Sequence, residues 1–500
     1  MSPLALLQDG SLRATFDALF AGPWALATAP IAALGVGVCL LIVADIVAAL
    51  RPAKPLVFAG SVFVAFLYLV QQLGAEPGVV LAGSYLADRT TALWGILFLA
   101  ATLLAWVYSL GYYRSPSEQP FKGEHDVLML TTPIGMLLMV GAQDLVVFFV
   151  GLELLSIPLY ALAAFQRARA TSVEAGIKYF LLGTFATGFL LYGSALVYAG
   201  EGTVSLIELR AQGITSPLAL AGVGLIAASV FFKVSVFPFH LWVPDVYQGS
   251  PTPVTALMAT GTKAAAFGFL VGVSFLLPTE AALLVGIVGL LTMAAGNLGA
   301  LLQDDLKRLL AYSGVSHAGT LLLVVAATLA TGDGSLQADA MDAALYYMGA
   351  YVFAATGAFG LIALLEADGE RFTKLESLKG LARTRPGAAA ALALFMLSLG
   401  GIPATGGFLG KWFVFSVLVN AGLKSGSTAM IVVAVIGALL SVVALGYYLR
   451  VIVALYMQPA PEGEPAPATE RPLTAGIATV VCAAFTLLLG VLPGVFLALL

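Results

Sequence analysis

Four lysines stand inside long apolar runs of this sequence, where a cation is costly to place. Lys233 lies in FFKVSVFPFHLWVPD, residues 231–245, and Lys178, Lys263 and Lys411 occupy comparable runs. Burying an ammonium in a bilayer costs at least about 2.5–3.5 kcal/mol, so four unpaired ones would cost on the order of 10 kcal/mol. Desolvation disfavours the charged form, so a buried lysine releases its proton more readily than one in water. These residues therefore suggest proton transfer.

A proline, a histidine and a distant glutamate extend this pattern. Pro238 breaks the helix and frees backbone carbonyls for water. His240 titrates near neutral pH without further help, which suits a proton relay. Glu153, in VGLELLSIPLYAL, is a deep carboxylate whose change of partner would switch a nearby lysine between holding and releasing a proton. We predict functional roles for these groups and for the four lysines.

Structural alternatives exist for several of these residues. Glu153 could be a structural counter-ion, His240 a satisfied core histidine, and Lys178 a lysine that reaches to the membrane surface. Asp45 is interpreted as structural, and His317, in AYSGVSHAG, as lining a path or capping a polar network. His125 is placed in a loop without a role.

The composition fixes the class of protein that must position these groups. Of 500 residues, 60% are hydrophobic and 10% charged, and the mean hydropathy is +1.00. Soluble domains carry roughly 25% charged residues, so this is a polytopic membrane protein. A net charge of -4 without a basic block argues against a nucleic-acid partner. Cys39 and Cys482 are too few and too far apart for a disulfide framework, an Fe–S cluster or a zinc site, so no cofactor or metal is expected in this chain.

Fourteen runs are long enough to approach the roughly 20 apolar residues of a membrane span. We predict an all-α protein with spans at 24–49, 55–73, 91–111, 127–142, 145–165, 174–199, 217–247, 251–277, 281–301, 308–330, 340–365, 387–420, 428–457 and 473–497. The runs at 217–247 and 387–420 exceed one straight crossing and contain Pro238 and Pro403, so both are predicted to be broken helices.

The two breaks indicate an internal repeat. We predict an N-terminal three-helix segment at 1–126, five-helix repeats at 127–277 and 281–457, and a linker with a last spanning helix at 458–500. Five is an odd number, so the second repeat enters from the opposite side, as in transporters with inverted repeats.

Basic residues predict the orientation, because they concentrate on the cytoplasmic side. With both termini outside, the inner side carries Arg51, Lys54, Arg114, Lys122, Arg167, Arg169, Lys307, Arg308, Arg371, Lys374, Lys379, Arg383, Arg385, Arg450 and Arg471. The outer side carries Arg13, Arg89, Arg210 and Lys424.

Depth along straight helices places several candidates at one level. At 1.5 Å per residue, Lys233, Lys263, Lys411 and Glu153 lie about 16 to 21 Å from the inner face. His240 lies about 10 Å and Lys178 about 6 Å from that face, closer to the cytoplasm.

Five segments together resemble a known family. They are GLELLSIPLYAL, SVEAGIKYFLLG, FFKVSVFPFHLWVPDVYQGSP, DDLKRLLAYSGVSHAG and GGIPATGGFLGKW. The chain resembles NADH-quinone oxidoreductase subunit N, an antiporter-like membrane subunit of bacterial respiratory complex I, from about residue 120 to 457.

The resemblance implies a proton relay of six residues. Glu153 is similar to the family's helix-five glutamate and Lys178 to its helix-six lysine partner. Lys233 resembles the central lysine on broken helix seven, and His240 the histidine after its proline. Lys263 resembles the helix-eight relay lysine and Lys411 the terminal lysine on broken helix twelve.

The resemblance also implies where the remaining chemistry takes place. NADH, FMN, Fe–S clusters and quinone are expected on partner subunits, and quinone reduction there would drive proton translocation in this chain. The expected partners are the sister antiporter-like subunits and the lipid bilayer, in a bacterial inner membrane. The sister subunit M carries glutamate where this chain has Lys411, and sister L extends into a long lateral helix.

Two other functions stay open at this point. The same fold serves in multi-subunit sodium/proton antiporters, which are secondary transporters without NADH chemistry. A non-transporting assembly subunit is the third reading, although a scaffold has no use for the cost of mid-membrane lysines.

Overall fold

The computed structural model describes residues 23–113, 123–332, 334, 336–366, 373–459 and 473–499. The basic residues Arg13, Arg114, Lys122, Arg371 and Arg471, used above to predict the orientation, lie outside these residues, as does part of the predicted segment 1–126 and of the linker.

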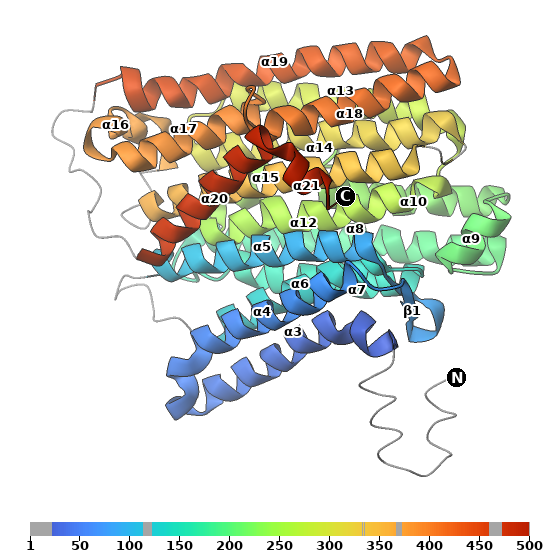
Figure 1. Cartoon of the computed structure of the whole chain (residues 1–500), viewed down its shortest axis with the longest axis horizontal. Helices are drawn as coiled ribbons and strands as arrows, with labels where there is room; N and C mark the ends of the chain where they lie inside the picture. The colour runs from blue at the N-terminus through green and yellow to red at the C-terminus, as the bar shows by residue number, and fades with distance from the viewer. Residues whose placement is uncertain are drawn as a thin grey trace.

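The described chain is almost entirely helical, and its helices lie side by side in one bundle (Figure 1). In order they are α3 (Pro23–Ile46), α4 (Lys54–Gln72), α5 (Arg89–Tyr112), α6 (Gly123–Gly141), α7 (Leu145–Ala163), α8 (Ala170–Glu201), α9 (Leu206–Gln212), α10 (Pro217–Val234), α11 (Val243–Gly249), α12 (Thr252–Gly272), α13 (Ala282–Leu301), α14 (Leu306–Thr331), α15 (Gln337–Glu366), α16 (Leu381–Thr384), α17 (Pro386–Gly400), α18 (Gly406–Ser425), α19 (Thr428–Met457), α20 (Leu473–Val491) and α21 (Pro493–Leu497). Two short antiparallel strands, β1 (Gly78–Val80) and β2 (Tyr85–Ala87), form a hairpin. The all-α prediction is confirmed.

Thirteen helices of the described residues are long and apolar enough to cross a membrane. The fourteenth expected span corresponds to α6, which has 19 residues but carries Glu124 and Asp126 in its first turn. His125, expected in a loop, is buried in that same turn, where its Nδ1 lies 3.3 Å from Asp126. The prediction for His125 was wrong because the charged residues Glu124 and Asp126 beside it, which suggest a loop, belong to the first turn of the helix.

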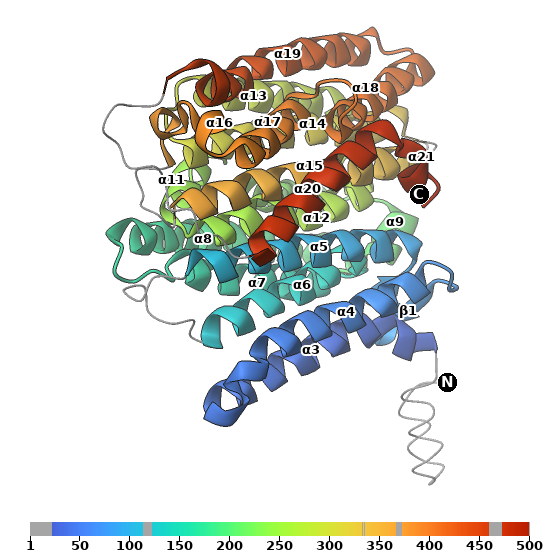
Figure 2. The ribbon, with the colours of Figure 1, turned by 60° about the vertical axis from the view of Figure 1, so that its left-hand side comes forward.

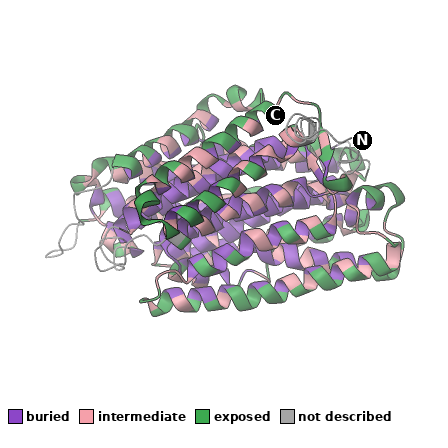
Figure 3. Cartoon of the chain, turned by 90° about the horizontal axis from the view of Figure 1, so that it is seen from below, coloured by how far each residue is buried: buried purple, intermediate pink, exposed green. Residues whose placement is uncertain are grey.

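Burial divides the helices into a centre and a shell. The most apolar window of α12 is fully buried, and those of α14 and α15 are 94% buried. The corresponding windows of α3, α4, α8, α19 and α20 are only 28% buried. Buried residues fill the centre of the bundle and exposed ones lie along its outer helices (Figure 3). In a bilayer this outer surface needs no polar residues, since lipid is as apolar as leucine.

Small residues let neighbouring helices approach closely. A methyl group on Gly193 of α8 would meet the carbonyl oxygen of Gly222 on α10, and the converse holds for Gly222. The glycine-rich piece GTFATGFLLYG, residues 183–193, is therefore a packing face, as small residues often are in membrane bundles.

Both predicted helix breaks are present, and the helix before each break ends in the same way. Helix α10 ends before Ser235, which has a φ of 70°, and Val236 N–H donates to the Phe231 carbonyl. Helix α17 ends before Gly401, with a φ of 83°, and Ile402 N–H donates to the Leu397 carbonyl. These left-handed caps satisfy carbonyls that the broken helices would otherwise leave unpaired.

The helices fall into two successive sets of five, and in each set the fourth helix is the interrupted one. The first set runs α6, α7, α8, α10 with α11, and α12, and the second runs α13, α14, α15, α17 with α18, and α19. Helix α12 packs against α15 and so joins the two sets at the centre. The opposite orientation of the two repeats and their exact limits stay predictions.

Candidate functional site

Lys233 lies in the last turn of α10, directly before the first break. It is 4% exposed, and its Nζ donates to Ser156 Oγ of α7 at 2.7 Å and to Tyr179 OH of α8 at 3.1 Å. The rings of Tyr160 and Tyr179 lie 5.8 and 5.2 Å from Nζ. The amine is thus held by neutral hydroxyls and aromatic faces, which can accommodate both of its protonation states.

Glu153 lies one turn from Ser156 on α7 and is partly buried. Its Oε1 accepts a hydrogen bond of 2.8 Å from Thr187 Oγ1 of α8. The Glu153 carboxylate and the Ser156 hydroxyl, which contacts Lys233 Nζ, therefore lie one turn apart on the same helix.

Lys178 has other partners than the one implied by the resemblance. Its Nζ lies 2.7 Å from Glu174 Oε1, one turn away on α8, and 2.8 Å from Asp245 Oδ2 on α11. Arg308 Nη1 of α14 lies 2.7 Å from the other Asp245 oxygen. Among the described residues, Lys178 and Glu153 form no direct ion pair. The sequence analysis missed Asp245, although it follows the break in WVPD.

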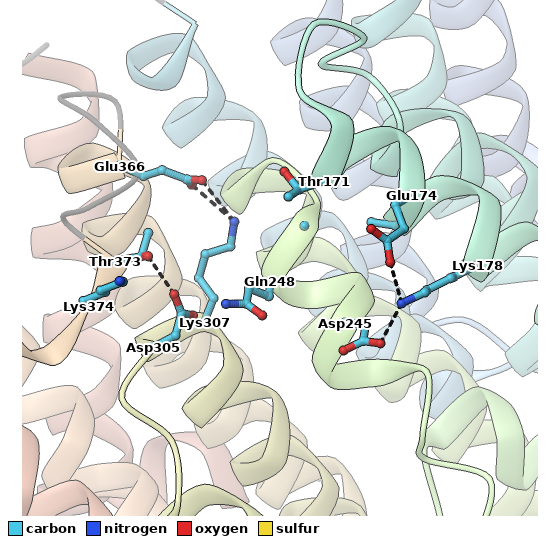
Figure 4. A pocket seen from close by; sticks show the side chains of 12 residues that line it. Thr171, Glu174, Lys178, Asp245, Gln248, Asp305, Lys307, Glu366, Thr373 and Lys374 are labelled. Atoms are coloured by element: carbon cyan, nitrogen blue, oxygen red, sulfur yellow. Dashed lines mark hydrogen bonds and ion pairs between the residues drawn. The ribbon is translucent and has the colours of Figure 1, made fainter.

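A polar cavity of about 530 Å³ surrounds Lys178 at one end of the bundle (Figure 4). Its walls come from the ends of α8, α11, α14 and α15, which are far apart in sequence. Side chains of both charges line it, including Lys178, Asp245, Lys307 and Glu366.

Lys307 and Glu366 are a buried ion pair on the wall of that cavity. Lys307 Nζ lies 3.2 Å from Glu366 Oε1 and 2.7 Å from the Ser250 carbonyl oxygen, and the two side chains are 1% and 4% exposed. Arg169 Nη1 also lies 3.2 Å from Glu366 Oε1. The Thr252 hydroxyl donates a hydrogen bond to the other oxygen of this carboxylate. The sequence placed Lys307 on an inner loop end, so its burial is a finding of the structure.

His240 lies in the break itself, between α10 and α11. It is 6% exposed, and its Nδ1 has no hydrogen-bond partner among the described residues. The hydroxyl of Ser235, at the start of the break, is likewise buried and unpartnered. Buried polar atoms of this kind are normally satisfied by internal water.

Lys263 is deep inside α12 and 2% exposed. Its Nζ donates to the carbonyl oxygen of Gly314 on α14 at 2.6 Å. A methyl group at position 314 would lie 2.8 Å from Lys263 Nζ, so a larger residue there would displace the end of this lysine side chain.

A histidine and tyrosine network continues from this point. His317, one turn after Gly314, contacts Tyr347 OH at 2.6 Å through Nδ1 and Tyr448 OH at 3.0 Å through Nε2. Tyr351 lies against the same ring, with 4.8 Å between ring centroids. The imidazole of His317 therefore joins the hydroxyls of Tyr347 on α15 and Tyr448 on α19.

Lys411 lies on α18 and reaches back across the second break. It is 8% exposed, and its Nζ donates to the carbonyl oxygens of Leu399 at 3.1 Å and Gly400 at 2.9 Å. Two of the last carbonyls of α17 thus hold a cation, where the helix dipole favours positive charge.

Asp45, interpreted as structural from the sequence, forms an ion pair near the surface of the bundle. Lys54 Nζ lies 3.2 Å from Asp45 Oδ1, at the turn that joins α3 and α4. No group of three or more His, Cys, Asp or Glu side chains that could hold a metal is found in the described residues.

Comparisons with known proteins place this arrangement in a family. The family described as NADH:quinone oxidoreductase/Mrp antiporter, TM matches residues 142–441. NADH-quinone oxidoreductase subunit N of Myxococcus xanthus is 40% identical over 450 residues, which cover 84% of this chain and 85% of that protein. The Trichlorobacter lovleyi protein of the same name is 39% identical, over 87% of this chain and 89% of its own length.

This chain is also similar to chains of solved structures. A chain of respiratory complex I from Thermus thermophilus with bound aureothin is 34% identical and has a TM-score of 0.78, covering 94% of this chain and 98% of that one. A chain of the Mrp complex from Dietzia sp. has a TM-score of 0.76 at 21% identity, covers 95% of this chain and 96% of that one, and shares the fold alone. The motif resemblance is confirmed, and the chain belongs to the NADH-quinone oxidoreductase subunit N family.

Proposed function

We propose that this chain moves protons across the membrane within an NADH-quinone oxidoreductase, with its own side chains as carriers. The observation that carries the proposal is the set of three nearly solvent-free lysines, Lys233, Lys263 and Lys411, each held by neutral oxygen atoms. An amine bound to hydroxyl or carbonyl oxygens keeps hydrogen-bond acceptors whether it is charged or neutral. Such lysines are suited to load and release a proton.

The proton path begins at the cavity around Lys178. Its mixed charges and open polar volume suit the uptake of a proton from water. His240 and Ser235, with their unpartnered buried atoms, would hold the water that connects the break to Lys233. Pro238 in the same break has no N–H and so leaves a carbonyl for that water.

Glu153 is the switch in this proposal. It lies one turn from Ser156 on α7, and the Ser156 hydroxyl contacts Lys233 Nζ. When the negative charge is present, it favours the ammonium form of the lysine, and when its pairing changes, Lys233 passes its proton on toward Lys263.

The second half of the path runs through the histidine network to the other break. Lys263 would pass a proton through His317 and the tyrosine hydroxyls to Lys411. In support of this route, the Tyr347 and Tyr448 hydroxyls lie within hydrogen-bonding distance of the two nitrogens of the imidazole. Release from Lys411 on the outer side completes the transfer.

The driving reaction would take place in partner subunits. NADH oxidation and quinone reduction require FMN, Fe–S clusters and quinone, which we assign to those partners. Sister antiporter-like subunits of complex I would adjoin this chain in a bacterial inner membrane, with both termini of this chain outside.

The test compares two single substitutions of lysines on α18, each made in the assembled complex. Lys411 is buried in the path, whereas Lys424 is exposed at the end of the same helix. We expect Lys411→Met to lower proton uptake into vesicles by about a hundredfold, because proton carriers contribute roughly 10² or more to a transfer step. Lys424→Met should leave uptake per NADH oxidised unchanged.

The same measurement separates the antiporter alternative. Wild-type proton uptake that depends on NADH and quinone supports the proposal. Full pumping by Lys411→Met, or sodium-dependent exchange without associated flavin and Fe–S subunits, would refute it.

A further inference from the structure

An apolar groove of about 720 Å³ lies on the outer face of the bundle, away from the relay. Its walls are the end of α15, the first half of α17 and the first half of α20. Helix α20 crosses these helices obliquely rather than parallel to them (Figure 2).

Small and aliphatic side chains make the inside of the groove apolar. Ala388, Ala391 and Leu394 line it on α17, and Gly476 and Ala483 on α20. The hydroxyl of Thr479 does not interrupt this wall, because it donates to the Ala475 carbonyl at 2.9 Å and lies 3.0 Å from Tyr108 OH.

The groove is polar at one end. Thr384 and Arg385 line that end, immediately before α17 begins, and Arg383 is exposed beside them. Leu365, also in the wall, precedes Glu366, so this is the bundle end that carries the polar cavity.

The dimensions of the groove fit one leaflet of a bilayer. From Arg385 to Leu394 the wall rises about 14 Å at 1.5 Å per residue. Half of a hydrocarbon core of about 30 Å is about 15 Å. A basic residue at the membrane surface and an apolar channel of one leaflet's depth match a lipid headgroup and its acyl chain.

We propose that this groove is a binding site for an anionic phospholipid, with an acyl chain between α17 and α20 and the phosphate beside Arg385. Anionic headgroups are preferred because Arg385 lines the polar end of the groove and the exposed Arg383 lies two residues before it. Each basic residue near a membrane surface contributes about fivefold to the binding of an anionic lipid.

Two glycines allow the site to be tested with a matched control. Gly476 lines the groove on α20, and Gly224 lies on the exposed face of α10. A side chain added at either position meets no atom within 4 Å. Gly476→Phe fills the groove, and Gly224→Phe adds the same bulk to another lipid-facing helix.

The experiment labels the assembled complex, in membranes, with phosphatidylglycerol or phosphatidylcholine that carries a photoreactive acyl chain. Peptide mass spectrometry then locates the label. We expect wild type and Gly224→Phe to be labelled in α15, α17 and α20, and Gly476→Phe to lose this label. Arg385→Gln should lower the preference for phosphatidylglycerol by about fivefold.

Three results would overturn the proposal. They are unchanged labelling of the groove in Gly476→Phe, equal labelling by the two lipids in wild type, and no labelling because a helix of a partner subunit fills the groove. Copurification of the other subunits shows in each case that the variant has assembled.

Discussion

The three buried lysines that we propose as proton carriers differ in the atoms that hold them, and the difference follows from their positions. Lys233 meets two hydroxyls on neighbouring helices, whereas Lys263 and Lys411 meet backbone carbonyls. A backbone acceptor cannot be removed by a side-chain substitution and keeps its place in every protonation state. We therefore expect the second half of the relay to depend more on its histidine and tyrosines than on its lysine acceptors.

His317 provides a prediction at the residue scale. His317→Gln keeps polar atoms near Tyr347 and Tyr448 but removes the group that titrates. We expect proton uptake to fall by roughly 10², because the substitution interrupts proton transfer. The midpoint of thermal unfolding of the complex (its thermal midpoint) should stay close to that of wild type.

His317→Phe separates transfer from stability. It removes the imidazole partner of the Tyr347 hydroxyl, which costs about 1–3 kcal/mol for a buried group left unpaired, whereas the Tyr448 hydroxyl keeps its contact with Ser313 Oγ. Loss of pumping should then be accompanied by a lower thermal midpoint. If His317→Gln pumps as well as wild type, the imidazole is not part of the path.

The two breaks show how a membrane helix can be interrupted without exposing its backbone to lipid. Each upstream helix ends in a left-handed residue, and the following N–H groups return to its last carbonyls. The second break is more crowded, because the Lys411 side chain also lies against Gly401. This contact couples the geometry of the helix end to the position of the amine.

Gly401→Ala tests that coupling at the scale of the element. Gly401 has a φ of 83°, and a methyl group there would lie 2.9 Å from Lys411 Cδ. We expect a loss of about 1–2 kcal/mol for the left-handed conformation, seen as a lower thermal midpoint, together with reduced proton uptake.

Gly224→Ala is the control for that substitution. Gly224 lies within α10 with open space around it, so alanine should be neutral or stabilising by up to about 1 kcal/mol. Equal effects of the two substitutions would contradict the importance of the left-handed cap.

At the scale of the whole molecule, the two five-helix sets are tied together at one end by a buried charge cluster. Arg169 begins α8 in the first set, and Lys307 and Glu366 belong to α14 and α15 in the second. Thr252, at the start of α12, adds a hydrogen bond to the same carboxylate. The cavity wall is therefore built from both halves, and its shape depends on their contact.

Glu366→Gln should weaken this contact. Removing one partner of a buried ion pair costs about 3–5 kcal/mol, because the remaining cations stay buried without compensation. We expect a clear drop in the thermal midpoint of the purified complex.

Glu376→Gln serves as the comparison, because its pair with Lys379 is at 3.6 Å and the Glu376 side chain is 75% exposed. Surface pairs of this kind contribute about 0–1 kcal/mol. A similar stability of the two variants would mean that the cluster does not hold the halves together.

The sequence by itself determined the helical membrane fold, the two broken helices and most of the buried basic residues. The reason is that a bilayer imposes one local rule along the chain: apolar runs of fixed length span it, while prolines and charges inside them stand out. Lys233 and Lys411 were recognisable from their own neighbours alone.

The tertiary structure decided which groups meet. Lys178 contacts Asp245 instead of Glu153, His317 contacts the hydroxyls of Tyr347 and Tyr448, and Lys307 is buried beside Glu366. These pairs join residues on different helices, and their contacts depend on helix rotation and tilt, which hydropathy does not specify because lipid-facing and protein-facing positions are equally apolar. Packing of the bundle therefore fixed the partners of charges whose presence the sequence had already indicated.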